Sequence, residues 1–136
     1  MNKLIKLSLV FMALSFVSCE KEYSPAYCLE NLTGEDIVIY TPIREEGITI
    51  LTDYKVFIFG VSEEIDDYVE AFCGERDYDE PYVTFFYKEK YYKETSLVGN
   101  SIFNGSAWRL ETGRKQSTHT FEITEEYILS LPEVEI

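Results

Sequence analysis

The chain has 136 residues, of which 25 are acidic and 12 are basic, so its formal net charge is −13 at pH 7. This charge repels phosphate backbones and anionic head groups, which argues against nucleic acid binding and against direct recognition of a lipid surface. The acidic excess favours cationic partners or Ca²⁺. It can also serve solubility alone, because charged runs most often form a solvated surface. The length suits one domain with a core of its own.

The first residues have the pattern of an export signal. Two basic residues, Lys3 and Lys6, precede an apolar run over residues 7–17. The small residue Ser18 then stands directly before Cys19. The apolar run is too short to span a bilayer as a mature helix, so we expect it to act as a signal peptide that is removed.

The segment that ends this signal, Phe16–Cys19, resembles a bacterial lipobox. In a lipobox the cysteine thiol is acylated, the peptide before it is removed, and the new amino terminus is acylated as well. The resemblance therefore implies a lipoprotein signal peptide over residues 1–18 and lipidation at Cys19. Each buried CH₂ contributes about 0.8 kcal/mol, so several acyl chains hold a domain stably on a membrane. Removal of residues 1–18 takes away two lysines and no acid, which changes the net charge from −13 to −15.

Residues 19–26 carry charge and Pro25 without periodicity, which is typical of a lipidated tether. A single domain is expected over residues 27–136, because neither a repeat nor a second apolar span interrupts it. In its first half, turn residues separate short segments of strand type. The strands expected there are 27–32, 36–41, 48–51 and 54–61. The last of these is apolar on both faces at Val56–Phe59, so we expect it in the centre of a sheet.

The strongest helix signal lies over residues 63–73. Ser62 is a candidate N-cap, the first turn is acidic, and Gly74 marks the end. A hairpin is expected around Glu89-Lys90, and a loop over residues 98–106. The remaining expected elements are strands over 82–88, 91–97, 107–112 and 117–123, and a helix over 125–131 that Thr124 caps. The pattern predicts a mainly β fold, an antiparallel two-sheet sandwich, Ig-like or similar, with one short helix near 63–73 and a short C-terminal helix.

Two cysteines remain after lipidation, Cys28 and Cys73. An even pair in an exported chain is typical of a disulfide. Such a bond would stabilise the fold by roughly 4 kcal/mol, because it lowers the entropy of the unfolded chain. The alternative is two separate buried thiols. The spacing leaves both open, because it does not show whether the two Cα atoms come within reach.

Several segments share a pattern with a known group of proteins. They are Cys19 with the acidic residues after it, Cys28–Gly34, Phe85–Tyr87, Trp108 and Phe121–Glu126. Together they resemble the small β-sandwich lipoproteins of Bacteroidetes, over most of residues 19–131. The resemblance implies a cell-envelope address and a β-sandwich, and it carries over no catalytic residue. In that group an acidic stretch after the lipidated cysteine accompanies display on the outer face of the outer membrane, and Glu20-Lys21-Glu22 is a short stretch of this kind. The implied location is the outer membrane, on its periplasmic or its surface-exposed side.

Four tyrosines are expected around one hairpin, and they are the candidate ligand-binding residues: Tyr78, Tyr82, Tyr91 and Tyr92. Their flat rings could stack on sugar rings while neighbouring carboxylates accept hydroxyl hydrogens. The alternative is that the rings pair across strands and cover the sheet. Trp108 alternates with Leu110 on its strand and is expected in the core.

The chain lacks the common catalytic and cofactor motifs. It contains no Gly-x-Ser-x-Gly, no phosphate-binding glycine loop and no His-Glu-x-x-His. The only histidine, His119, shares a strand face with Phe121, as packed histidines do. The acidic turn at residues 77–80 offers oxygens to Ca²⁺ but has no glycine at the sharp-turn position of a calcium loop. We therefore expect no catalytic residue, no metal and no cofactor.

These observations favour a lipid-anchored extracytoplasmic protein that acts as a non-enzymatic binding or accessory module of the bacterial cell envelope. Its expected partners are the membrane, through the lipid on Cys19, and an extracellular or periplasmic protein or glycan bound by loops at one end of the sandwich. Nucleic acid is not expected. The alternatives are a glycan-binding module that uses the four tyrosines, and a hydrolase whose carboxylates come from the acidic excess. Two converging buried carboxyl groups in a cleft would favour the hydrolase.

Overall fold

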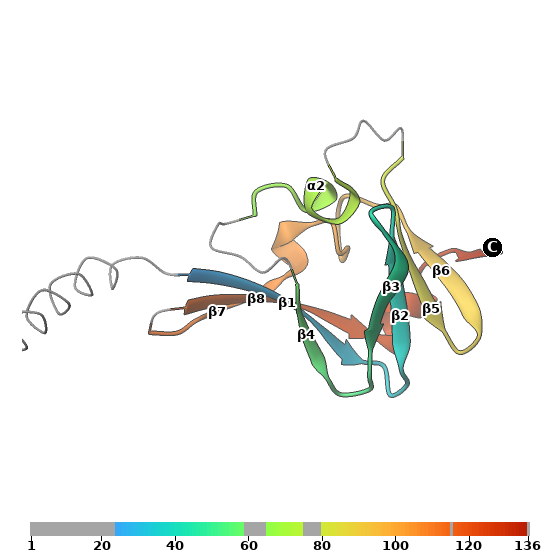
Figure 1. Ribbon diagram of the computed structural model, residues 1–136, viewed down its shortest axis with the longest axis horizontal. Helices are drawn as coiled ribbons and strands as arrows, with labels where there is room; N and C mark the ends of the chain where they lie inside the picture. The colour runs from blue at the N-terminus through green and yellow to red at the C-terminus, as the bar shows by residue number, and fades with distance from the viewer. Residues whose placement is uncertain (1–23, 59–64, 75–79, 115, 136) are drawn as a thin grey trace, which may run out of the picture.

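A computed structural model describes residues 24–58, 65–74, 80–114 and 116–135 (Figure 1). The strands in these ranges are β1 (Ser24–Leu32), β2 (Ile37–Thr41), β3 (Arg44–Ile50), β4 (Lys55–Ile58), β5 (Val83–Tyr87), β6 (Lys90–Glu94), β7 (Arg109–Thr112), β8 (Gln116–Thr124) and β9 (Glu133–Val134). The helices are α2 (Tyr68–Cys73), the single 3₁₀ turn η1 (Gly105–Ala107) and α3 (Glu125–Leu129).

The strands form two sheets that pack against each other (Figure 1). The four-stranded sheet has the order β4-β1-β8-β7, and the five-stranded sheet has the order β3-β2-β5-β6-β9. Apolar residues from both inner faces form one core. The predicted two-sheet β-sandwich with two short helices is therefore confirmed.

One ladder departs from the predicted antiparallel arrangement. β1 and β8 pair in parallel over their whole length, from Ser24 opposite Gln116 to Leu32 opposite Thr124. The prediction was wrong here because a parallel ladder joins segments that a long crossover separates, and hairpin signals do not report such pairs. The ladder also begins at Ser24, so three residues predicted as tether belong to the fold.

The strand predicted as central is an edge strand. β4 pairs only with β1 among the described strands. Its residues Val56 and Ile58 pack toward the core, whereas Phe57 on the opposite face is 64% exposed. An exposed aromatic residue on the solvent face of an edge strand imitates the pattern of a strand buried on both faces, which explains the error. Residues 59–61 of the predicted strand lie outside the described ranges.

The helix predicted over 63–73 is shorter at its start. Residues 65–67 precede α2, and the Asp67 carboxylate caps it by accepting from the backbone N–H of Val69 at 3.0 Å and of Glu70 at 3.2 Å. The predicted cap, Ser62, lies outside the described ranges. Gly74 ends the helix as predicted, with φ 87°. α2 buries Tyr68, Phe72 and Cys73 and covers the opening between the two sheets (Figure 1).

Local signals located the second hairpin and the last helix correctly. The turn between β5 and β6 is Lys88-Glu89, one residue before the predicted pair, and both residues have positive φ, as a type I′ turn requires. Thr124 caps α3, because its hydroxyl accepts from the backbone N–H of Tyr127 at 3.0 Å. α3 ends at Leu129, two residues before the predicted end.

Trp108 lies in the core, as predicted, but strand alternation is not the reason. It directly precedes β7, and Leu110, which was expected on the same face, is 56% exposed. Its indole N–H donates to the carbonyl of Ile102 at 3.0 Å, so the polar edge of the ring is satisfied. The centroid of its ring lies 4.8 Å from that of Tyr68 and 5.6 Å from that of Phe121. These contacts join α2 to β8 across the four-stranded sheet.

A buried carboxylate joins the C-terminal helix to the five-stranded sheet. Glu94 on β6 is only 4% exposed. One of its oxygens accepts from the Tyr127 hydroxyl at 2.9 Å, and the other accepts from the backbone N–H of Ser96 at 3.2 Å. Burial of the ring, the charge of Glu94 and this hydrogen bond all raise the pKa of Tyr127. The bond matters for stability, because a buried carboxylate without donors is costly.

The first prediction concerns this bond. Tyr127→Phe keeps the ring but removes the hydroxyl, so Glu94 stays buried with one donor fewer. We expect the free energy of unfolding, measured by urea titration with circular dichroism, to fall by about 1–3 kcal/mol. The matched control is Tyr54→Phe at a tyrosine that is 62% exposed, which should change stability by less than about 0.5 kcal/mol. A Tyr127→Phe variant as stable as the wild type would contradict the prediction.

The second prediction follows from the raised pKa of Tyr127. The folded chain keeps a proton that the unfolded chain releases near the ordinary tyrosine pKa of about 10. The stabilisation is complete below about pH 10 and is lost as the pH rises above it, by at most about 1.4 kcal/mol per pH unit. Urea titrations between about pH 8 and pH 11.5 should show a shallower alkaline decline for Tyr127→Phe than for the wild type. Parallel declines would show that this hydroxyl does not control alkaline stability.

Candidate functional site

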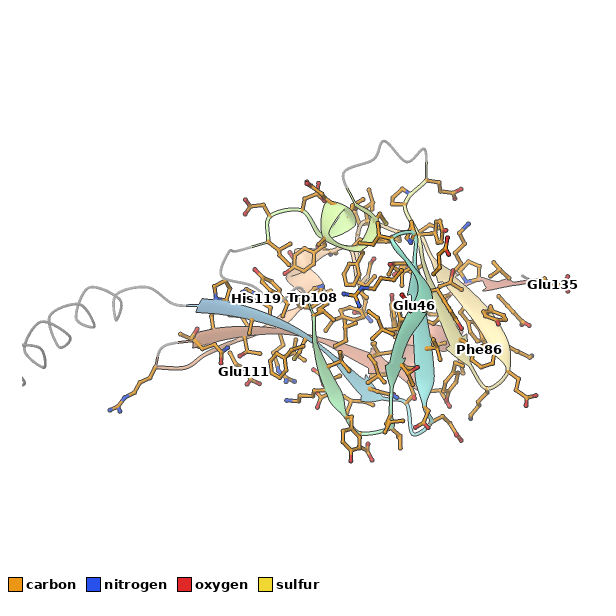
Figure 2. The ribbon with its side chains drawn as sticks, in the orientation of Figure 1. Glu46, Phe86, Trp108, Glu111, His119 and Glu135 are labelled. Carbon is orange, nitrogen blue, oxygen red and sulfur yellow. The ribbon has the colours of Figure 1, made fainter. Side chains whose placement is uncertain are left out.

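Aromatic side chains cover the outer face of the five-stranded sheet. Along its strands, residues that point to the core alternate with half-buried residues that point outward, among them Phe86 (Figure 2). Cross-strand pairing arranges the outward residues in two rows, Val38–Phe86–Tyr91–Val134 and Tyr40–Thr84–Lys93. The face therefore presents rings and β-branched side chains next to a single lysine.

The rings on this face contact one another. The centroids of Phe86 and Tyr91, which are direct cross-strand partners, are 4.9 Å apart, and those of Tyr40 and Tyr91 are 6.3 Å apart. The Lys93 ammonium lies 5.0 Å from the centroid of the Tyr82 ring. The cross-strand pairing that was expected as the alternative is thus present at Tyr91.

The pairing nevertheless leaves a hollow beside the turn between β2 and β3. This open depression has a volume of ≈ 460 Å³. We call it the tyrosine depression, and its lining residues are Tyr40, Thr41, Pro42, Arg44, Glu45, Tyr82, Thr84 and Tyr91. It lies on a sheet face, whereas the sequence predicted a site on the loops at one end of the sandwich. Of the four tyrosines predicted as ligand-binding, it brings together Tyr82 and Tyr91.

The other two predicted tyrosines are not placed there. Tyr92 points into the core and is 8% exposed, so its prediction as a ligand-binding residue was wrong. The physical reason is the two-residue period of a strand, which puts neighbouring Tyr91 and Tyr92 on opposite faces. Tyr78 lies outside the described ranges. Sequence reasoning missed Tyr40, although its alternation with the buried residues Ile39 and Thr41 indicates an outward position.

A glycine on β3 leaves the space that the Tyr40 ring occupies. Gly47 on β3 has φ 74°, and a Cβ there would lie 2.8 Å from Cγ1 of Val38 and 2.9 Å from Cε1 of Tyr40. Any other residue would therefore collide with both side chains. The missing side chain lets the Tyr40 ring lie against β3 at the edge of the depression.

Polar groups complete the lining. Arg44 forms no ion pair within 4.0 Å with any described residue, and Glu45 beside it forms none either. Thr41 is 6% exposed, and its buried hydroxyl forms no hydrogen bond with a described residue. Thr41 and Arg44 also line a smaller cavity of ≈ 50 Å³ between the sheets. The depression thus combines flat apolar rings with a guanidinium, a carboxylate and hydroxyl groups, which suits a flat ligand that bears polar substituents.

The two cysteines do not form a disulfide. Both are free and buried. The Cys28 sulfur lies 3.2 Å from the Thr120 hydroxyl, and the Cys73 thiol donates to the carbonyl of Tyr82 at 3.6 Å. Burial raises the pKa of the Cys73 thiol. The disulfide alternative was therefore wrong, because Cys28 belongs to the ladder of β1 and β8 whereas Cys73 ends α2, next to the start of β5.

The remaining candidates do not assemble a second site in the part of the chain that the structure describes. The His119 ring stacks on Tyr27, with centroids 4.7 Å apart, so it is packed as expected. Within the described ranges no group of three or more His, Cys, Asp or Glu side chains could hold a metal ion, and residues 77–79 of the acidic turn lie outside them. Glu94 is the one buried carboxylate there, and donors already occupy both of its oxygens.

The chain matches no protein-family model, no curated protein and no solved structure. The resemblance to small lipoproteins of Bacteroidetes therefore stays a prediction from the residues. Among the described helices, none has the length and apolar character needed to cross a membrane. The tyrosine depression is consequently identified by its geometry and chemistry.

Proposed function

We propose that the protein is a lipid-anchored binding module of the bacterial cell envelope, and that it binds carbohydrate in the tyrosine depression without chemical conversion. The observation that carries this proposal is the convergence of Tyr40, Tyr82 and Tyr91 around an open hollow of ≈ 460 Å³. Its volume falls within the range of about 300–1,000 Å³ that is usual for small-molecule sites.

The rings come from separate parts of the chain and are held in place by packing. Tyr91 contacts both Phe86 and Tyr40, and Gly47 leaves space for the Tyr40 ring. Tyrosine rings held in this way offer apolar area at low cost in conformational entropy. The apolar face of a sugar can stack on them, while its hydroxyl groups can donate to the Glu45 carboxylate.

The buried carboxylate supports binding over hydrolysis. A carboxylate-dependent hydrolase needs two carboxyl groups that converge on one bond. Glu94 instead accepts from Tyr127 and Ser96 inside the core. This arrangement suits a structural role for the buried acid and leaves the open aromatic face for ligand binding.

The proposed anchor would keep the domain close to the membrane. Cys19 precedes the first described strand residue, Ser24, by a short segment. An extended chain spans at most about 3.6 Å per residue, so residues 19–23 reach no more than about 18 Å. The start of β1 would therefore be held near the lipid surface.

The third prediction tests the anchor. Cys19→Ala removes the thiol that would be acylated, so the protein should move from the membrane fraction to the soluble fraction, and from the detergent phase to the aqueous phase. Cys28→Ser is the matched control, because it changes a buried thiol of the domain and should leave membrane partitioning intact. Unchanged partitioning of Cys19→Ala would refute lipid anchoring at this residue.

The fourth prediction tests the site. Tyr82→Ala and Tyr91→Ala each remove a ring from the depression, so affinity for a saccharide selected on a glycan array should fall at least about tenfold, or about 1.4 kcal/mol, in titration calorimetry. Tyr54→Ala removes an exposed tyrosine outside the depression and should leave affinity unchanged. Each variant is first checked for a wild-type unfolding curve. If the Tyr54→Ala variant loses as much affinity as Tyr91→Ala, the depression is not the binding site.

A further inference from the structure

Arg44 is the feature of the tyrosine depression that ring stacking does not require. Basic residues are scarce in this chain, with 12 against 25 acidic residues. In the described ranges, the basic residues that form ion pairs with glutamates are Lys55, Lys88, Lys90 and Arg109. Arg44, Lys93 and Arg114 have no ion pair with a described residue. Of these, Arg44 lines the depression, and Lys93 lies against the ring of Tyr82, which lines it.

The two cations stand beside the stacking surface. Arg44 lines the depression together with Tyr82 and Tyr91, and the Lys93 ammonium lies 5.0 Å from the Tyr82 ring centroid. Two positive charges stand against the one negative charge of the lining residue Glu45, which favours an anion at this place although the chain as a whole repels anions. A neutral sugar can only accept hydrogen bonds from these cations, whereas a carboxylate also pairs with their charge.

Arg44 also stands opposite an unsatisfied group. It pairs with Thr41 across the turn between β2 and β3, after a register shift in β2 between Ile39 and Thr41. The Thr41 hydroxyl is buried, and no residue in the described ranges forms a hydrogen bond with it. A register shift of this kind redirects side chains and is common beside functional sites. Arg44 thus brings five guanidinium N–H donors to the lining of the depression, whereas the Thr41 hydroxyl is buried and not open to it.

We infer that the depression binds a saccharide unit that carries a carboxylate, that is, a uronic acid, with the carboxylate on Arg44 and the sugar ring on Tyr82 and Tyr91. The inference rests on the proposed function and names its ligand class. The planar fork of a guanidinium matches the two oxygens of a carboxylate, and such bidentate pairs are stronger than neutral hydrogen bonds. Lys93 adds a second positive charge beside the ring, and Glu45 accepts from hydroxyl groups of the sugar.

The test compares each acidic oligosaccharide with its own methyl ester, because the two share every ring and hydroxyl and differ only in charge. The probes are oligogalacturonate, alginate oligomers and hyaluronan fragments, each with its methyl ester, in titration calorimetry at low salt. We expect the wild type to bind at least one of the acidic forms about tenfold or more tighter than its ester. Arg44→Gln should remove this preference and leave affinity for the ester within about twofold.

Arg114→Gln is the matched control, because Arg114 is an exposed arginine between β7 and β8 that also lacks an ion pair with a described residue. It should keep the full preference for the acidic form. Equal affinity of the wild type for acid and ester, or a preference that persists in Arg44→Gln, would overturn the inference while sugar binding itself stands. Failure of the wild type to bind any saccharide, neutral or acidic, would overturn the inference and the proposed function together.

Discussion

The parallel ladder between β1 and β8 is the constraint on which the rest of the structure depends. It joins the first described strand to a strand near the end of the chain, so everything between them must cross over and return. The ladder turns Leu29 and Phe121 to the inner face, where the apolar residues of the second sheet cover them. Closing so long a loop costs conformational entropy, which the burial of both inner faces offsets.

The end of this ladder also sets the C-terminal contacts. β8 ends at Thr124, the residue whose hydroxyl caps α3, so the helix starts where the strand stops. α3 then brings Tyr127 to Glu94 on the other sheet. The Phe121 and Tyr127 rings meet edge to face, with centroids 5.0 Å apart. The continuous segment of β8 and α3 thus connects the two sheets through an apolar contact and a buried hydrogen bond.

The two outer sheet faces differ in their chemistry. On the four-stranded sheet, Arg109 forms ion pairs with three glutamates, at 3.9 Å to Glu30, 3.0 Å to Glu111 and 2.9 Å to Glu122. Exposed pairs of this kind contribute little to stability, but they neutralise the charge of the arginine. On the five-stranded sheet the outward positions hold rings, and the outward Lys93 forms no ion pair with a described residue. This contrast supports the proposal that a ligand binds on the aromatic face.

Short-range patterns in the sequence determined the elements that depend on neighbouring residues. The Thr124 cap and the hairpin between β5 and β6 each follow from residues within a few positions of one another, because capping and turn geometry are local effects, as strand alternation is. The same alternation separates Tyr91 from Tyr92. The export signal before Cys19 is also a pattern of neighbouring residues, and it stays a prediction.

Only the tertiary structure decided which distant strands pair and which side chains meet. Nothing local distinguishes an edge strand from a central one at Phe57, or a parallel partner of β1 from an antiparallel one. Likewise, Tyr40 and Arg44 join Tyr82 and Tyr91 only because β2 lies between β3 and β5 in the sheet. Strand order is chosen by the burial of whole faces, a property of the complete fold that no single stretch of sequence contains.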